Sequence, residues 1–312
     1  MLHLRMSVPA SASDAVVAFL SGDERVTNLM AVRGASLRPA GDAVLCDVAR
    51  EAASDVLERL MELGMGDGSV SIETVDAAPT RDARRAEEAA PGSPDDGVVW
   101  ELVEDGAWSG VRGSWSFYAF LTLATTIAAV AVVLDSAILV IGAMVVGPEF
   151  AAVAAVAIGV VLRRPRLSLA ALRLLASGFA VAIALTIVLA LAARTAGWVD
   201  AATILADRPQ TGFIWHPDRW SFVVALLAGT AGVLSLTAGR TSALVGVFIS
   251  VTTVPAAGNL AVALALGVGS EIVGSAAQLG VNLAGMVLAG VVTLLVQRLA
   301  WQGVRASRWT TT

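Results

Sequence analysis

The sequence predicts an N-terminal α+β domain followed by an α-helical multi-pass membrane domain. Charge separates the two parts: residues 1–114 carry 20 acidic side chains against 10 arginines, and residues 115–312 carry 6 against 11. The chain is 56% hydrophobic, and its long apolar runs follow residue 114. An internal repeat within those runs is the third observation. Because the arginines there stand at the ends of apolar runs, we expect a lipid bilayer as partner and no nucleic acid.

The N-terminal domain is expected at residues 1–76. Four short runs alternate apolar and polar residues, as strands with one buried face do, and two runs of helical periodicity lie between them. The expected strands are 2–8, 26–35, 43–49 and 69–75, and the expected helices are 11–20 and 51–63. This βαββαβ order is that of a ferredoxin-like domain. Such domains bind amino acids, metals or each other, so the order alone assigns no ligand.

Two short segments join the domains. Residues 77–97 are rich in Ala, Pro, Gly, Asp, Glu and Arg, which predicts a solvated linker. Residues 98–114 mix Trp100 and Trp108 with acidic residues. This mixture is typical of an interfacial helix whose tryptophans lie at headgroup level.

Six membrane helices are expected within residues 115–300, followed by a cytoplasmic tail at 301–312. About 20 apolar residues span a bilayer core, and each of the six runs is long enough or nearly so. The expected spans are 115–134, 136–162, 168–193, 220–238, 242–267 and 271–297. Eight arginines fall on the N-terminal side of the membrane and three on the other. This bias places both termini in the cytoplasm, in an inner (plasma) membrane, and residues 194–219 outside.

The membrane part contains a repeat. The tripeptide Trp-Ser-Phe begins the first expected helix at 115 and recurs at the start of the fourth at 220. The second and fifth helices carry prolines about halfway along, Pro148 and Pro255. Three helices per repeat reverse the direction of the second copy, so the sequence predicts a 3+3 inverted repeat with broken helices. Such breaks point to a binding site near the bilayer midplane.

The first break combines three residues. Pro148 removes a backbone donor, and Gly147 beside it favours a kink. Glu149 adds a carboxyl group at the same depth, where an acid normally has a partner or a function. Two interpretations remain open for Glu149: a functional acid, or a neutral glutamic acid that is hydrogen-bonded between helices.

Neutral polar residues accompany the second break. Thr252 and Thr253 precede Pro255, and Asn259 follows it. The threonines either line the site or bond to the preceding helical turn. The sixth helix carries two amides four residues apart, which places them on one face. The candidate site residues are Gly147, Pro148, Glu149, Thr252, Thr253, Pro255, Asn259, Gln278 and Asn282.

The chemistry of this set leaves the solute open. Oxygen ligands suit protons or hard metal cations, whereas helix N-termini at the breaks suit an anion. No histidine–cysteine metal spacing, phosphate-binding glycine loop or nucleophile elbow is present, so we expect no enzyme activity and no cofactor. Asp135 and Glu271 are expected to be solvated helix ends. The loop 194–219 either caps the outer vestibule or rests on the membrane interface through its aromatic residues.

One segment resembles a known family. The run DSAILVIGAMVVGPEF at 135–150, the Trp-Ser-Phe at 115 and the NLAG at 282–285 are similar to the uncharacterised membrane family called domain of unknown function 389. The resemblance covers about residues 98–300. The family often has Gly-Pro where this chain has Ala151-Ala152. The resemblance implies a bacterial multi-pass membrane protein and no particular activity.

We therefore expect a transporter or channel for a small solute or ion, with its site at the two breaks. The N-terminal domain would regulate it, and self-association into a homo-oligomer would help to enclose a pore. The alternative is a non-transporting membrane sensor or scaffold whose soluble domain binds a ligand or partner. Polar groups at the breaks favour transport, whereas tight apolar packing there favours a scaffold.

Overall fold

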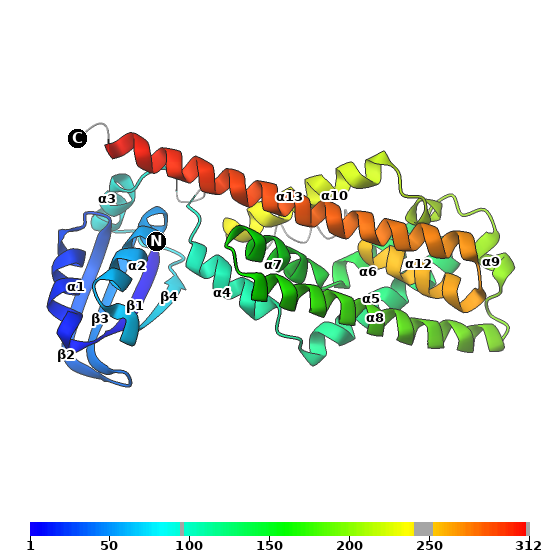
Figure 1. Cartoon of the computed structure of the whole chain (residues 1–312), viewed down its shortest axis with the longest axis horizontal. Helices are drawn as coiled ribbons and strands as arrows, with labels where there is room; N and C mark the ends of the chain where they lie inside the picture. Colours follow the sequence, from blue (N-terminus) through cyan, green and yellow to red (C-terminus); the bar gives the residue numbers. More distant parts are fainter. Residues whose placement is uncertain (94–96, 240–251, 310–312) are drawn as a thin grey trace. The chain divides into compact units, whose positions relative to one another are not determined.

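The computed structural model describes residues 1–93, 97–239 and 252–309 (Figure 1). The chain forms two compact units, unit 1 with Met1–Val103 and Leu299–Thr312, and unit 2 with Glu104–Arg298. Unit 1 contains a small antiparallel sheet and unit 2 is helical. The expected combination of a part with a small sheet and a part made of apolar helices is thus confirmed.

Unit 1 is built on a four-stranded antiparallel sheet with strand order β2-β3-β1-β4. Two helices connect the strands. The elements are β1 (Leu2–Val8), α1 (Ala10–Gly22), β2 (Val26–Leu37), β3 (Ala40–Val48), α2 (Ala53–Glu62) and β4 (Ser69–Thr74). All six lie where the alternation and helical periodicity predicted them, with bounds shifted by a few residues. Gly64, at φ +97°, takes the left-handed conformation that ends α2.

The core of unit 1 lies on one face of this sheet. In β1 the side chains of Leu2, Leu4, Met6 and Val8 are all buried, as period-two alternation requires. Leu4, Met6 and Val8 pack with buried residues of β3 and of both helices, among them Val16, Leu20, Val44, Cys46, Val56 and Leu60. Burial of these apolar side chains provides the main stabilisation of the unit.

The segment expected to be a linker contains a helix. In α3 (Arg81–Ala89) the Thr80 side chain caps the N-terminus by accepting a hydrogen bond from the Ala83 backbone N–H at 3.2 Å. Ala83 and Ala86, three residues apart, are buried on one face. Capping and this narrow apolar face stabilise a helix that the polar composition concealed.

The segment expected as an interfacial helix forms α4 (Trp100–Gly110). Val99 just before it is buried in a small cluster with Leu2 and Ala53 of unit 1, and Leu102 packs against that cluster. The first turn of α4 is therefore attached to the unit 1 core.

Unit 2 is a bundle of apolar helices. They are α5 (Trp115–Val133), α6 (Ala137–Val146), α7 (Glu149–Val161), α8 (Pro165–Thr195), α9 (Ala201–Leu205), α10 (Arg219–Thr237), α12 (Thr253–Leu266) and α13 (Gly269–Trp309), the last continuing into unit 1. Among the described residues, four helices are long and apolar enough to cross a membrane, or five if the bent pair α6–α7 is one span. Of the expected span 242–267, only α12 is described, since residues 240–251 lie outside the described part.

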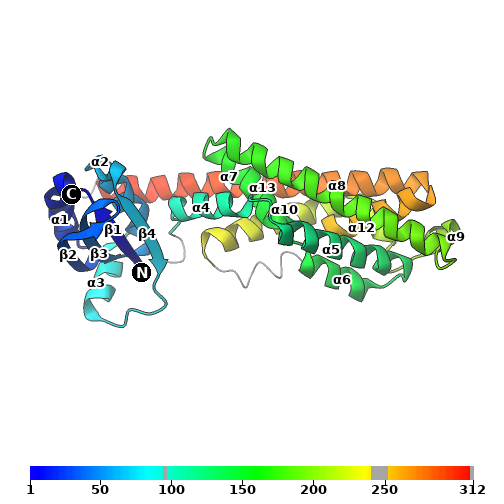
Figure 2. The same cartoon turned by 90° about the horizontal axis from the view of Figure 1, so that it is seen from below.

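The outer surface of unit 2 is apolar, as expected for helices in lipid. Ile138, Val188 and Val273 are 81%, 62% and 71% exposed. Inside the bundle, α5 packs against α6, α8 and α12, and α7 packs against α8. α12 approaches α5 closely at Gly258, where a Cβ would lie 2.7 Å from the Ala128 methyl group. Figure 2 shows α12 beside the first part of α13.

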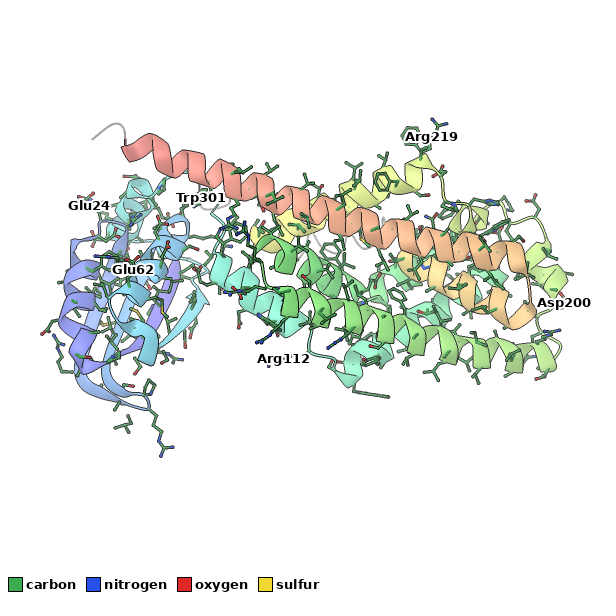
Figure 3. All side chains as sticks on the ribbon, in the orientation of Figure 1. Glu24, Glu62, Arg112, Asp200, Arg219 and Trp301 are labelled. Carbon is green, nitrogen blue, oxygen red and sulfur yellow. The ribbon has the colours of Figure 1, made fainter. Side chains whose placement is uncertain are left out.

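The loop 194–219 is partly folded into the bundle. It contains α9, capped by Asp200, and a short 3-10 turn, η3 (Gly212–Trp215), before Asp218 caps α10. Ile214 is fully buried against residues of α5, α6 and α12. Asp200 and Arg219, near the two ends of this region, are labelled in Figure 3 and are exposed. The middle of the loop therefore belongs to the packed bundle.

Candidate functional site

The first helix break lies where the sequence predicted it. α6 ends at Val146, α7 begins at Glu149, and the two helices are bent by 55°. Pro148 is the N-cap of α7, and its ring nitrogen cannot donate the hydrogen bond that would continue α6. Gly147 is extended rather than helical, with φ −65° and ψ 126°. The break thus exposes a new helix N-terminus inside the bundle.

Glu149, the first residue of α7, turns its carboxyl group into the bundle and is only 8% exposed. The Thr253 hydroxyl donates a hydrogen bond of 2.7 Å to its Oε1 atom. Its Oε2 atom is buried without a hydrogen-bond partner among the described residues. A Cβ at Gly147 would collide with Oε2 and lie 2.8 Å from a methyl group of Val254. Glycine at position 147 therefore makes room for the carboxyl group.

The second helix start lies directly opposite. α12 begins at Thr253, with Thr252 at its N-cap. Pro255 is the third residue of α12 and is buried, in the first turn where a helix needs no backbone donors. Pro255 therefore belongs to a helix start, and any break before it lies in residues 240–251, outside the described part.

Two helix N-termini consequently meet at one carboxyl group. Glu149 is in the first turn of α7, and its hydrogen-bond partner Thr253 is the first residue of α12. Helix N-termini carry partial positive charge and free N–H groups, which favour an anionic group between them. The Glu149 carboxylate is suited to that position.

Thr252 connects this pair to α13. Its Oγ1 atom accepts hydrogen bonds from Gln278 Nε2 at 3.0 Å and from Asn282 Nδ2 at 2.8 Å. Gln278 and Asn282 are 1% and 2% exposed. The Oε1 atom of Gln278 is a second buried acceptor without a partner among the described residues. The structure thus brings together Glu149, Thr252, Thr253, Gln278 and Asn282 as one polar cluster, which we call the break cluster.

Asn259 belongs to a different group. Its Oδ1 atom accepts from Arg208 Nη1 at 3.0 Å, and its Nδ2 atom donates to Glu271 at 3.0 Å and to Ser275 at 2.8 Å. Arg208 also forms an ion pair with Glu271. We call these four residues the ion-pair network; each is at most 7% exposed. Asn259 therefore holds the loop and α13 together rather than lining the break.

The expectation of a solvated Glu271 is wrong, because Glu271 is 1% exposed and paired with Arg208. A second acid binds the same loop. Asp135 accepts hydrogen bonds from the backbone N–H groups of Gln210 and Thr211, at 3.1 and 2.9 Å. Sequence reasoning missed Arg208, the partner of Glu271, because a partner 63 residues away in the chain leaves no local signal. A signal did exist in α13, where Glu271, Ser275, Gln278 and Asn282 recur at helical spacing.

Asp42 and Glu51, both in unit 1, have displaced pKa values. Hydrogen bonds from Ser13, from the Gly34 backbone N–H and from Arg33 lower the pKa of Asp42 to about 2. Burial raises the pKa of Glu51, whose side chain is 3% exposed and makes no hydrogen bond to another described residue. Neither acid belongs to a predicted site.

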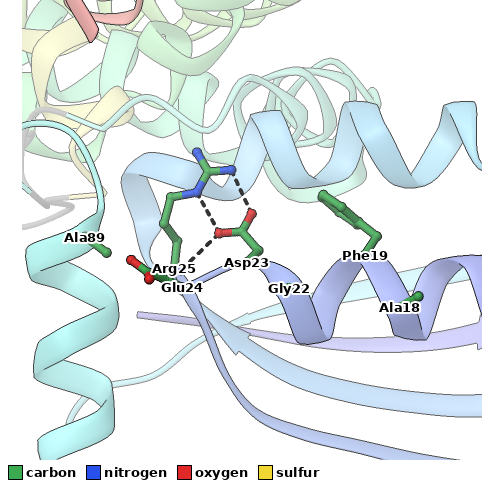
Figure 4. A pocket seen from close by; sticks show the side chains of 7 residues that line it. All are labelled: Ala18, Phe19, Gly22, Asp23, Glu24, Arg25 and Ala89. Atoms are coloured by element: carbon green, nitrogen blue, oxygen red, sulfur yellow. Dashed lines mark hydrogen bonds and ion pairs between the residues drawn. The ribbon is translucent and has the colours of Figure 1, made fainter. Parts of the chain in front are cut away.

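Unit 1 also has an open hollow of about 520 Å³ (Figure 4). It is lined by Ala18, Phe19, Gly22, Asp23, Glu24, Arg25 and Ala89. Arg25 donates to Asp23 through Nε at 2.9 Å and Nη2 at 2.7 Å, and although burial opposes ionisation, these bonds keep the pKa of Asp23 below its usual range. The charges of Asp23 and Arg25 thus satisfy each other. Within the described ranges, no group of three or more His, Cys, Asp or Glu side chains is placed to hold a metal ion.

Comparison with known proteins identifies one family. Residues 144–288 match the family model described as "Domain of unknown function (DUF389)". The match contains Gly147, Pro148 and Glu149 at its N-terminal end and the polar residues of α12 and α13 at its C-terminal end. No curated protein and no solved structure matches the chain. The resemblance noted in the sequence is confirmed.

Proposed function

We propose that this chain, whose residues 144–288 match the DUF389 family model, is a membrane transporter or channel for a small solute or ion and not an enzyme. The site is the break cluster. The N-terminal domain regulates transport from the cytoplasm, and the protein works as a homo-oligomer in the inner membrane with both termini inside. The arginine distribution supports this orientation, because eight arginines fall on the proposed inner side.

One observation carries the proposal: a buried carboxyl group stands between two helix N-termini within the apolar bundle. An acid in a membrane interior is costly and usually marks a substrate or ion pathway. Broken helices that present their ends to a solute are a recurring transporter design. A scaffold would be more stable with apolar packing here, yet Thr252, Gln278 and Asn282 extend the polar cluster.

The spacing of the helices supports an inverted repeat of three helices each. Three pairs of helices start 104 residues apart, and α5 and α10 are both 19 residues long. The pairs of starts are Trp115 and Arg219, Glu149 and Thr253, and Pro165 and Gly269. In this register Glu149 and Thr253 are equivalent positions, and they are hydrogen-bonded to each other. The pseudo-two-fold axis would then pass through the break cluster.

The same register changes one detail of the repeat. Pro148 corresponds to Thr252, since both are N-caps, whereas Pro255 stands three residues further along its helix. Both prolines lie at a helix start, Pro148 as the N-cap of α7 and Pro255 in the first turn of α12.

A ferredoxin-like assignment of unit 1 has similar support. Its βαββαβ element order and antiparallel β2-β3-β1-β4 sheet agree with that fold. Domains of this kind commonly act as ligand-binding or self-associating modules, which suits a regulatory role.

The test is ion flux in liposomes. Liposomes that contain the purified protein would be adsorbed on a solid-supported membrane electrode. The current would be recorded after a sudden rise in the concentration of protons, sodium, potassium, ammonium, chloride or phosphate. We expect a current with wild-type protein that Glu149→Gln lowers to the level of empty liposomes while size-exclusion behaviour is unchanged. Glu104→Gln is the matched control, because Glu104 pairs with Arg164 at the exposed surface of the same unit.

The outcomes separate the two candidate functions. Equal currents for wild type and Glu149→Gln would contradict a transport role for this acid. Loss of folding in Glu149→Gln, with no wild-type current for any ion, would favour the sensor or scaffold.

A further inference from the structure

A polar face runs along the first half of α13. Glu271, Ser275, Gln278 and Asn282 follow one another at i, i+4, i+7 and i+11, so they share one side of the helix. Each of the four is at most 2% exposed. At 1.5 Å per residue the face is roughly 16 Å long. Polar side chains are costly inside an apolar bundle, so an uninterrupted row of four needs an explanation beyond helix packing.

α12 completes the row on the opposite side. Asn259 bonds to Glu271 and Ser275, and two helical turns earlier Thr252 bonds to Gln278 and Asn282. We call this contact between α12 and α13 the polar seam. Its outer end is the ion pair of Arg208 and Glu271, next to the loop 194–219. Its inner end is the break cluster with Glu149.

The two ends of the seam differ in their hydrogen bonding. At the outer end, Arg208 donates to Asn259 and Glu271, and Asn259 donates to Glu271 and Ser275, so both Glu271 oxygens and both groups of the Asn259 amide have partners. At the inner end, Glu149 Oε2 and Gln278 Oε1 are buried acceptors without partners in the described residues. Unfilled acceptors of this kind are completed by a donor, such as water or a proton on the carboxyl group.

Charge points to the same class of ligand. Glu271 has a cationic partner in Arg208, but Glu149 has no ion pair among the described residues. A carboxylate this deep, supported by one hydroxyl group and two helix ends, calls for a positive companion. Among the described residues, other charged or titratable groups lie near the outer end: Asp135 holds the backbone of Gln210 and Thr211. Arg194 donates to the Ala265 carbonyl of α12, and His216 stacks on Trp215, whose carbonyl lies against Gly274 of α13.

We propose that the coupling ion is the proton, and that it reaches Glu149 from the side of the loop 194–219 along the polar seam. Water that enters when the loop loosens links Ser275 to Gln278, and Gln278 belongs to the break cluster that contains Glu149. The proton adds to a Glu149 carboxylate oxygen and leaves by the same bond, so no other reactant is consumed. The ion-pair network closes the outer end between cycles. This inference rests on the proposed transport function and adds its coupling ion and route.

Cysteine accessibility tests the route without any transported solute. Cys46 is the only cysteine of the chain and is 0% exposed, so single cysteines in unit 2 can be followed directly. Phe213→Cys, at a 51% exposed position of the loop, identifies the loop side of sealed vesicles. We expect Ser275→Cys and Gln278→Cys to react with a small charged thiol reagent from that side.

Met286→Cys is the matched control for burial. Met286 lies one turn beyond Asn282 on the same side of α13 and is 3% exposed, but it belongs to the apolar part. It should not react from the loop side. Equal rates at 275, 278 and 286, or no reaction at the first two, would overturn the route.

Carbodiimide labelling tests the ion. Dicyclohexylcarbodiimide enters through lipid and forms a stable adduct with a protonated carboxyl group, so peptide mass spectrometry would report protonated Glu149. We expect labelling that falls as pH rises, is absent in Glu149→Gln, and is unchanged by sodium or potassium at fixed pH. Protection by either cation, or no labelling at any pH, would overturn the proton as the coupling ion.

The two proposals fail differently. A labelled Glu149 and a reactive seam in a protein that produces no current would contradict transport and leave proton access in place. A current that requires Glu149 in a protein with an unreactive seam would contradict this inference alone.

Discussion

The ion-pair network makes a quantitative prediction about what holds the outer loop in the bundle. Arg208 and Glu271 are 7% and 1% exposed, and Asn259 bridges both. Glu271→Gln leaves a buried guanidinium without its counter-charge, and Arg208→Met leaves a buried carboxylate. Removing one member of a buried ion pair costs about 3–5 kcal/mol. The double variant removes both charges, so its cost should be clearly smaller than the sum of the single costs.

The magnitude can be read as a melting temperature. For a unit of this size, each kcal/mol shifts the midpoint by about 2–4 °C, so each single variant should lose roughly 6–20 °C. The assay is thermal unfolding in detergent, followed by tryptophan fluorescence. Trp215 is a reporter near the network, since its backbone carbonyl packs against Gly274 of α13.

Asp14→Asn is the control for this series. Asp14 pairs with Arg33 at an exposed position of unit 1, where an ion pair contributes little. Single variants of Arg208 or Glu271 that melt with wild type would refute the buried network. A double variant whose loss equals the sum would show that the two charges do not interact.

Three further predictions concern the break and unit 1. Gly147→Ala should displace the nearby carboxyl group and lower carbodiimide labelling, whereas Gly142→Ala should not, because nothing lies within 4 Å of its Cβ position. Asp42→Asn should lower the urea concentration at which Cys46 becomes exposed at pH 7. The pKa of Asp42 is about 2 in the folded protein and about 3.9 in the unfolded chain, so its carboxylate stabilises the fold above pH about 4. The difference between the variant and wild type should vanish as pH falls toward 2. Glu51→Gln should raise the same urea midpoint at pH 7, because burial raises the pKa of Glu51 and penalises its charged form. The gain in stability should disappear at acidic pH, where both side chains are neutral. A gain that stays constant with pH would contradict this cause.

Local patterns predicted the elements of unit 1 well. Period-two alternation located β1, whose four buried residues share one face, and Gly64 correctly ended α2. The helix α3 was missed because its stability comes from a Thr80 cap and two alanines, which carry little weight in a polar segment. Local periodicity also located most helix bounds in unit 2.

The site was predicted in part, because its residues depend on long-range contacts. The first break is evident from three consecutive residues, Gly147, Pro148 and Glu149. The spacing of Gln278 and Asn282 likewise places them on one helix face. The bond between Glu149 and Thr253 joins residues 104 apart, which only folding can reveal. The contacts of Asn259 could not be foreseen for the same reason, since its partner Arg208 comes from a loop. The sequence indicates which polar residues are energetically costly to bury in an apolar bundle, but only the folded structure shows which of them contact each other.

The contact between Glu149 and Thr253 is the centre of the account, and one substitution tests it most directly. Thr253→Val removes the hydroxyl group that donates to Glu149 and keeps the side-chain shape. Thr125→Val removes an equally buried hydroxyl group that donates to the Leu121 carbonyl of its own helix. A hydrogen bond to a charged group contributes about 1.5–3 kcal/mol, roughly a tenfold to hundredfold change in equilibrium. In the liposome assay, Thr253→Val should therefore lower the proton-driven current by about tenfold or more, while Thr125→Val stays near wild type. Equal currents for the two variants would contradict a working site at the meeting point of the two helix starts.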